Sequence, residues 1–85
     1  MAREESMKKR RVYVTMNVQV NPDGIVRPKS MIWEDGEEYE VDRVKRIVPV
    51  ENGTRYTLMI GGRENYFYEQ SDRSWYTEVP MIANY

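Results

Sequence analysis

The alternation of apolar and polar residues is the feature that most constrains the fold of this chain. From residue 12 to residue 20 the sequence reads VYVTMNVQV, in which every second residue is apolar. A period of two is the period of a β-strand, where successive side chains point to opposite faces of a sheet. The segment therefore predicts a half-buried strand over residues 11–20.

Turn signals divide the rest of the chain at intervals of roughly eight to twelve residues. They combine Pro, Asp, Asn and Gly, the residues that favour tight turns, and they read NPDG at 21–24, EDGE at 34–37, ENGT at 51–54, GG at 61–62 and QSDR at 70–73. We therefore expect six strands, over residues 11–20, 25–33, 38–50, 55–60, 63–69 and 74–79.

Two of these strands are expected to be irregular. Pro28 has no N–H group to donate to a ladder, so it predicts an edge, a bulge or a break in the second strand. In the third strand Tyr39 and Val41 share one parity, whereas Val44, Val48 and Val50 share the other. This switch predicts a β-bulge near Asp42-Arg43, which would bend the strand.

Six short strands without a helical pattern predict an all-β protein. An 85-residue chain is long enough for one domain. We expect a small six-stranded meander that closes into an SH3-like barrel or a strongly bent sheet, because an OB-fold usually carries a helix between its third and fourth strands. The predicted organisation is a flexible basic tail over residues 1–10, the barrel over 11–80 and a C-terminal tail over 81–85.

The Gly61-Gly62 turn predicts the register of the hairpin around it. It places Tyr56 opposite Phe67 on one face, and Arg55 opposite Tyr68 on the other. The register of the last strand stays open: a two-residue loop would pair Phe67 with Tyr76, and a three-residue loop would pair it with Trp75.

Composition excludes several classes of chemistry. The chain has no cysteine and no histidine, so Ser/His/Asp and Cys/His mechanisms are excluded, and the commonest general base is missing. No set of nucleophile, base and orienting group stands out, so we expect a protein that is not an enzyme and uses no cofactor. The lack of disulfides and of a long apolar run predicts a cytoplasmic protein without a membrane partner.

A run of carboxylates surrounds the second predicted turn. Its members are Glu34, Asp35, Glu37, Glu38, Glu40 and Asp42. The spacing of a calcium-binding loop is absent, and side chains around a hairpin turn splay outward. We interpret the run as a charged, solvent-facing hairpin with Trp33 and Tyr39 as flanking core anchors, and we predict no metal site.

The candidate binding residues are aromatic and basic. In the predicted register Arg55, Tyr66 and Tyr68 share one face, and Trp75 joins them if the last loop has two residues; the tail adds Lys8, Lys9, Arg10 and Arg11. Rings that stack on bases and cations that contact phosphates are how proteins bind single-stranded nucleic acid. Single-stranded DNA is therefore the first expected partner. The alternatives are a protein partner or a homodimer, or cross-strand aromatic pairs that only hold the sheet together.

The sequence also resembles a group of short bacterial all-β proteins. The matching positions are Pro28, Ile32, Trp33, Asp35, Gly36, Tyr39, Val41, Val44, Arg55, Tyr56, Thr57, Gly62, Glu64, Trp75 and Glu78. No catalytic site or ligand comes with this resemblance, but it implies DNA-related work, because genes of the group often neighbour those of error-prone DNA polymerases. The group tends to have a longer loop before its Arg-Tyr-Thr, where this chain has only VENG.

Overall fold

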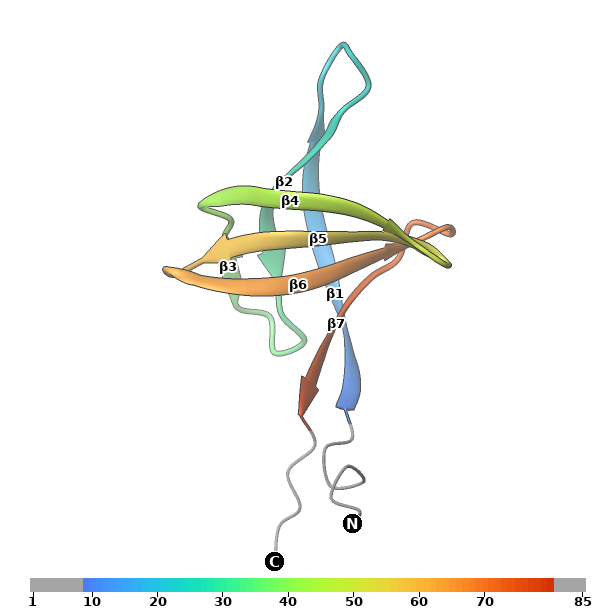
Figure 1. Ribbon diagram of the computed structural model, residues 1–85. Coiled ribbons are helices and arrows are strands. Elements are labelled where there is room, and N and C mark those ends of the chain that lie inside the picture. Colours follow the sequence, from blue (N-terminus) through green and yellow to red (C-terminus); the bar gives the residue numbers. More distant parts are fainter. Residues whose placement is uncertain (1–8, 81–85) are drawn as a thin grey trace, which may run out of the picture.

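The computed structural model describes residues 9–80, which form seven antiparallel strands and no helix (Figure 1). The strands are β1 (Lys9–Val20), β2 (Val26–Ile32), β3 (Glu38–Glu40), β4 (Arg43–Val50), β5 (Gly53–Ile60), β6 (Arg63–Gln70) and β7 (Trp75–Pro80). The protein is thus all-β, as predicted. Within the described range there is no helix long and apolar enough to cross a membrane.

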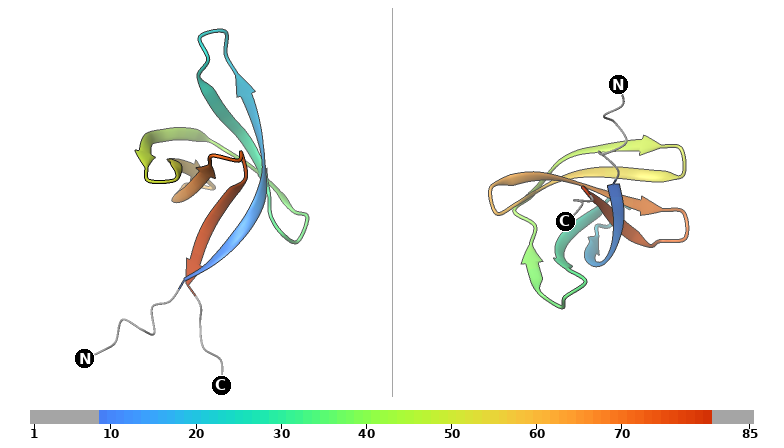
Figure 2. Two further views of the ribbon diagram at one scale, coloured as in Figure 1. Left: turned by 90° about the vertical axis from the view of Figure 1, so that its right-hand side faces the viewer. Right: turned by 90° about the horizontal axis from the view of Figure 1, so that it is seen from below.

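The strands make one strongly curled sheet in the order β3-β2-β1-β7-β6-β5-β4. The layer of β4, β5 and β6 crosses the long β1, and β7 links the two by pairing with both β1 and β6 (Figure 1). Seen from below, the sheet curves round into a half-barrel (Figure 2). The two edge strands, β3 and β4, are joined by only two residues, so the curl brings the edges of the sheet back together.

The prediction of six strands was wrong by one, because the expected third strand is divided. Its halves pair with different neighbours: β3 pairs with β2, and β4 pairs with β5. The linking residues confirm the division, since the Val41 N–H donates to the Lys29 carbonyl and the Asp42 N–H donates to the Met59 carbonyl. The bulge predicted near Asp42-Arg43 is therefore a break between strands.

Two bulges bend the sheet elsewhere. Asn17 pairs with Ser30 but Val18 pairs with Pro28, which leaves Lys29 as the extra residue. Of the three alternatives predicted for Pro28, the structure shows two: Pro28 lies at the bulge, and at this position β2 pairs only with β1 among the described residues, so it is also an edge. In β4 the register shifts around Lys45 in the same way. A bulge increases local twist and bends its strand, which lets such a small sheet curl.

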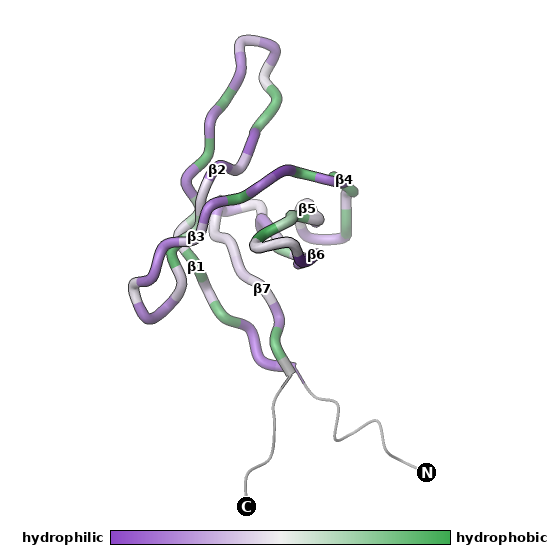
Figure 3. The backbone as a smooth tube through the Cα atoms, turned by 90° about the vertical axis from the view of Figure 1, so that its left-hand side faces the viewer, coloured by the Kyte–Doolittle hydropathy of each residue, from purple (hydrophilic) through white to green (hydrophobic). Residues whose placement is uncertain are grey.

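The core lies on the concave side of the curl. Val12, Met31, Tyr56, Leu58, Phe67 and Trp75 are buried there, and Figure 3 shows the hydrophobic positions alternating along the strands. The predicted β5–β6 register is confirmed in full, with Tyr56 opposite Phe67 and Arg55 opposite Tyr68. Both glycines of the connecting turn have positive φ, 60° and 79°, as a two-residue turn of type I′ requires.

Three turns share one design, an aspartate at the centre of a three-residue loop. Asp23, Asp35 and Asp72 each accept a hydrogen bond from the backbone N–H two residues ahead. In each loop the residue after the aspartate adopts a positive φ: 85° at Gly24, 90° at Gly36 and 76° at Arg73. The hydrogen bonds with Ser74 also lower the pKa of Asp72.

The last of these turns sets a β6–β7 register that differs from both predicted alternatives. Ser71, Asp72 and Arg73 form the loop, and Phe67 pairs with Thr77 rather than with Tyr76 or Trp75. Trp75 therefore shares the face of Phe67, is only 6% exposed and packs against Tyr56 at a ring distance of 4.7 Å. Tyr76 lies on the opposite face.

The acidic hairpin is a charged turn in the structure. Glu34, Asp35, Glu37, Glu38, Glu40 and Asp42 are all exposed, and among residues 9–80 no three carboxylates lie close enough together to hold a metal ion. Trp33 is half-buried against the core, but Tyr39 is 42% exposed. Of the two residues expected to anchor the hairpin in the core, Trp33 does so and Tyr39 does not.

The first and last strands, β1 and β7, lie at the expected limits of the domain. β1 begins at Lys9, so Lys9 and Arg10 are strand residues that pair with Pro80 and Val79. Lys8, the rest of the predicted basic tail and the predicted C-terminal tail over 81–85 lie outside the described residues.

Candidate nucleic-acid interface

A row of tyrosines crosses the face of the sheet opposite to the core. Tyr13 on β1 pairs with Tyr76 on β7, which pairs with Tyr68 on β6, which pairs with Arg55 on β5. Directly paired residues in an antiparallel sheet project to the same side. Four consecutive strands therefore contribute side chains to one continuous row.

Ring and guanidinium contacts connect this row to its neighbours. Tyr68 and Tyr76 stack with ring centroids 5.0 Å apart, and Tyr13 lies 5.7 Å from Tyr76. The guanidinium carbon of Arg11 lies 4.2 Å from the centre of the Tyr76 ring. We call the set of Tyr13, Tyr66, Tyr68 and Tyr76 with Arg11 and Arg55 the tyrosine face.

Arg55 and Tyr66 form the second cation–π contact of the tyrosine face. The guanidinium carbon of Arg55 lies 5.1 Å from the centre of the Tyr66 ring. The Nε atom of Arg55 is buried and has no hydrogen-bond partner among the described residues. A buried donor without an acceptor is costly, roughly 1–3 kcal/mol. Because a ligand cannot reach a buried atom, a phosphate could contact only the terminal amino groups of this guanidinium.

The rings of the tyrosine face differ in exposure. Tyr13 and Tyr66 are 53% and 51% exposed, whereas Tyr76 is buried. Burial raises the pKa of the Tyr76 hydroxyl, and the charge of Arg11 opposes that rise. The two exposed rings can accept a stacking partner. Tyr76 packs between Tyr13 and Tyr68 and fixes the position of the Tyr13 ring.

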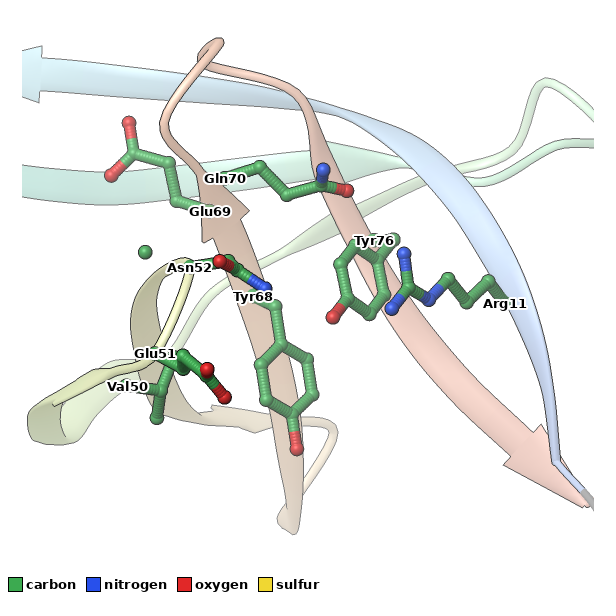
Figure 4. A pocket seen from close by; sticks show the side chains of 9 residues that line it. Arg11, Val50, Glu51, Asn52, Tyr68, Glu69, Gln70 and Tyr76 are labelled. Carbon is green, nitrogen blue, oxygen red and sulfur yellow. The ribbon is translucent and has the colours of Figure 1, made fainter.

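A cleft of about 220 Å³ opens at one end of the tyrosine face (Figure 4). Arg11, Tyr68 and Tyr76 form one side of it, and the β4–β5 turn with Asn52 approaches from the other. Glu51, Glu69 and Gln70 add acceptors at its rim. The cleft thus offers aromatic walls, one cation and several hydrogen-bonding groups.

Basic side chains predominate on this face of the strands β1 and β4 to β7. By register, Lys9, Arg11, Arg43, Arg46 and Arg55 lie on it together with Glu64 and Glu78. Lys45 forms an ion pair with Glu64 and lowers the pKa of that carboxyl. The face therefore carries a positive balance although the net charge of the whole chain is −1.

The structure brings together four of the predicted site residues, Arg11, Arg55, Tyr66 and Tyr68. Trp75 does not join them, because the β6–β7 register turns it into the core. Strand alternation also divides the basic run: Lys9 and Arg11 share the parity of the tyrosine face, whereas Arg10 lies 3.4 Å from Glu34 on the other side. Lys8 lies outside the described residues.

Sequence reasoning missed Tyr13 and Tyr76. By the alternation over residues 12–20 Tyr13 falls on the polar face of the first strand, but no pairing between the first and last strands was predicted, so Tyr13 was not placed beside Tyr76. The signal for Tyr76 is the likeness of SDR to PDG and EDG, which indicates the same three-residue loop. That loop gives the observed register.

No protein-family model, curated protein or solved structure matches this chain. Function is therefore inferred from the geometry of the described residues.

Proposed function

We propose that this protein is a non-enzymatic binding module that holds single-stranded nucleic acid, single-stranded DNA first, on the tyrosine face. The observation that carries the proposal is the continuous row of Tyr13, Tyr76, Tyr68 and Arg55 across four strands. Rows of aromatic rings with interleaved cations bind single strands because each base can stack on a ring while phosphates meet the cations.

Each part of the tyrosine face has a role in this binding. Tyr13 and Tyr66, the exposed rings, stack on bases. Arg11 and Arg55 contact phosphates through the ends of their guanidinium groups. Such contacts are insensitive to base sequence, because every base has a flat face and every phosphate the same charge.

We infer that the curled sheet is an SH3-like barrel in which the break at residues 41–42 replaces one continuous bent strand. The short link between β3 and β4 supports this, because it ties the two edges of the sheet together. The resemblance to short bacterial proteins encoded beside DNA polymerase genes supports DNA as the partner.

The test is a fluorescence-anisotropy titration with an end-labelled, mixed-sequence single-stranded oligonucleotide at low and at moderate salt. A label on the DNA is needed because Trp75 is buried on the opposite face. We expect saturable binding that weakens as salt rises, since phosphate contacts release counterions. A flat signal at both salt concentrations would contradict the proposal and favour a protein partner.

Two variants distinguish this face from the rest of the surface. Tyr66→Ala should weaken binding by about 1–3 kcal/mol, the contribution of one stacked base. Arg55→Ala should weaken binding and reduce the slope of the salt dependence by about one. Arg63→Ala is the matched control, because Arg63 pairs with Ile60 on the other face and should leave the affinity nearly unchanged.

A further inference from the structure

The β1–β2 hairpin extends beyond the rest of the molecule as an arm. β1 pairs with β7 only up to Val14, which lies opposite Trp75. From Thr15 to Val20, β1 pairs only with β2 among the described residues. In Figures 1 and 2 this hairpin projects past the layer of β4, β5 and β6. We call β1 residues 15–20, the turn and β2 residues 26–29 the arm.

The apolar stripe of β1 continues onto the arm without a covering partner. Val18, Val20 and Ile25 are 41%, 62% and 49% exposed, and Figure 3 shows hydrophobic segments along the projecting hairpin. A two-stranded ribbon alone is marginally stable in water, and three or more strands are needed for independent stability. The arm therefore has fewer strands than independent stability requires, and no other described element covers its apolar face.

The exposed edge of β1 differs from the other free edges of the sheet. β4 carries Arg43, Lys45 and Pro49 on its edge, and the arm segment of β2 carries Arg27, Pro28 and Lys29. Charges, bulges and prolines are the features that protect edge strands from pairing with another chain. The β1 segment TMNVQV has no charge and no proline, so it alone among these edges is unprotected.

We propose that the arm pairs with the arm of a second copy of this chain, β1 against β1, around a two-fold axis at Val18. The edge is free from Thr15, the first residue beyond the pairing with β7, to Asn21, where the turn begins. The centre of that window is Val18. Antiparallel pairing about Val18 uses the whole window and places Met16 of each copy opposite the partner's Val20.

This register is also compatible with the side-chain faces and the charges of the two copies. Because the side-chain period is two, only registers of this parity put the apolar residues of both copies on one face. Between Arg11 and Asp23 the chain has no charged residue, so self-pairing brings no like charges together. The result is a four-stranded sheet, β2-β1-β1-β2, with an isologous contact. A contact limited to one strand pair is small, so the dimer should be weak and dependent on concentration.

Cysteine cross-linking tests the register directly, because the natural chain has no cysteine. In Val18→Cys the two thiols face each other across the axis, at a Cα separation of about 4.5–5.5 Å that a disulfide can span. In Gln19→Cys, the matched control, the two cysteines are diagonal neighbours with Cα atoms about 7–8 Å apart, which is too far for a disulfide. Mild oxidation should convert most of the Val18→Cys protein to a covalent dimer and leave Gln19→Cys monomeric. Equal and low cross-linking of both variants would overturn the proposal.

Sedimentation equilibrium of the natural chain over a wide concentration range gives the second readout. The mass should rise from that of a monomer towards that of a dimer, and Val18→Lys should stay monomeric because two lysines would meet on the axis. Val50→Lys, at a 37% exposed valine on β4, should dimerise like the natural chain. A monomer at every concentration, or equal dimerisation of both lysine variants, would contradict pairing through the arm.

Discussion

At the scale of single residues, the turns show how closely sequence and backbone conformation are matched. Two of the three aspartate-centred loops end in glycine, which adopts positive φ without a steric cost. The third places Arg73 there at φ 76°. A non-glycine residue in the left-handed region costs roughly 1–2 kcal/mol, so this loop is the least favourable of the three.

Arg73→Gly should therefore raise the free energy of unfolding by about 0.5–1 kcal/mol, which is the relief of strain less the extra freedom of glycine in the unfolded chain. Urea denaturation measures the difference. Arg63→Gly is the matched control, since it makes the same chemical change on a strand at ordinary φ and should lower the free energy of unfolding. A lower midpoint for Arg73→Gly would contradict the assigned turn.

Tyr56 is the residue whose titration should affect stability. Its ring is buried against Trp75, and its hydroxyl donates to the Glu69 carboxylate over 3.3 Å. Burial, with a smaller contribution from Glu69, raises the pKa of Tyr56 to about 12. In the unfolded chain a tyrosine titrates near 10, so the hydroxyl keeps its proton longer in the folded state.

The stabilisation linked to Tyr56 should be complete below about pH 10 and disappear as the pH rises towards about 12, because over that range only the unfolded state loses the proton. The expected loss is roughly 2–3 kcal/mol once the pH has passed about 12, and about half of it should be seen near pH 11. Urea midpoints of the natural chain and of Tyr56→Phe, measured near neutral pH and near pH 11, check this. If both proteins lose stability equally between the two pH values, Tyr56 is not responsible.

At the scale of strands and turns, prediction succeeded where local chemistry alone determines the register. Gly61-Gly62 can form a two-residue turn with two positive φ angles, and the β5–β6 pairing followed from it. The β6–β7 pairing did not: the three-residue loop was one of the predicted alternatives, but the register assigned to it was wrong, because a loop over residues 71–73 places Gln70 opposite Ser74 and therefore Phe67 opposite Thr77. Trp75 was consequently left open between the core and the surface, and Tyr76 was omitted from the candidate site.

The division of the third strand depends on distant parts of the chain. The parity switch between Tyr39 and Val44 was visible in the sequence and predicted a local distortion there. Whether that distortion is a bulge or a break depends on the partners of each half, and these are β2 on one side and β5 on the other. Since β2 and β5 lie far apart in the sheet, each next to a different edge strand, no local pattern contains that information.

Gly53 is the residue on which the packing of β4, β5 and β6 depends. It pairs with Val50 on one side and with Gln70 on the other. Its φ is 156°, and a Cβ atom there would overlap the backbone carbonyl of Glu69. The absence of a side chain is therefore needed for the strands to approach each other.

Gly53→Ala should lower the free energy of unfolding by about 2–3 kcal/mol, because a backbone carbonyl must move to relieve the overlap. Gly24→Ala is the matched control: its φ is 85° and a Cβ atom there would meet nothing within 4 Å. It should cost only the strain of the left-handed conformation, about 1 kcal/mol. Equal urea midpoints for the two variants would show that close approach at Gly53 does not limit the packing.

At the scale of the whole molecule, the curled sheet separates two functions of its aromatic residues. Tyr56, Phe67 and Trp75 fill the concave side and stabilise the fold. The tyrosine face lies on the other side of the same strands, where Tyr13 and Tyr66 remain exposed while Tyr76 is buried. Side chains that alternate along β6 and β7 thus serve the core and the proposed interface in turn.

The most direct test of this account is a titration of ¹⁵N-labelled protein with a single-stranded oligonucleotide, followed by backbone amide chemical shifts. The account predicts that shifts concentrate at Tyr13, Arg55, Tyr66, Tyr68 and Tyr76, with small changes along the acidic hairpin at 34–38. Shifts that concentrate on that hairpin or on the arm, or no shifts at a protein concentration where anisotropy also reports no binding, would contradict it.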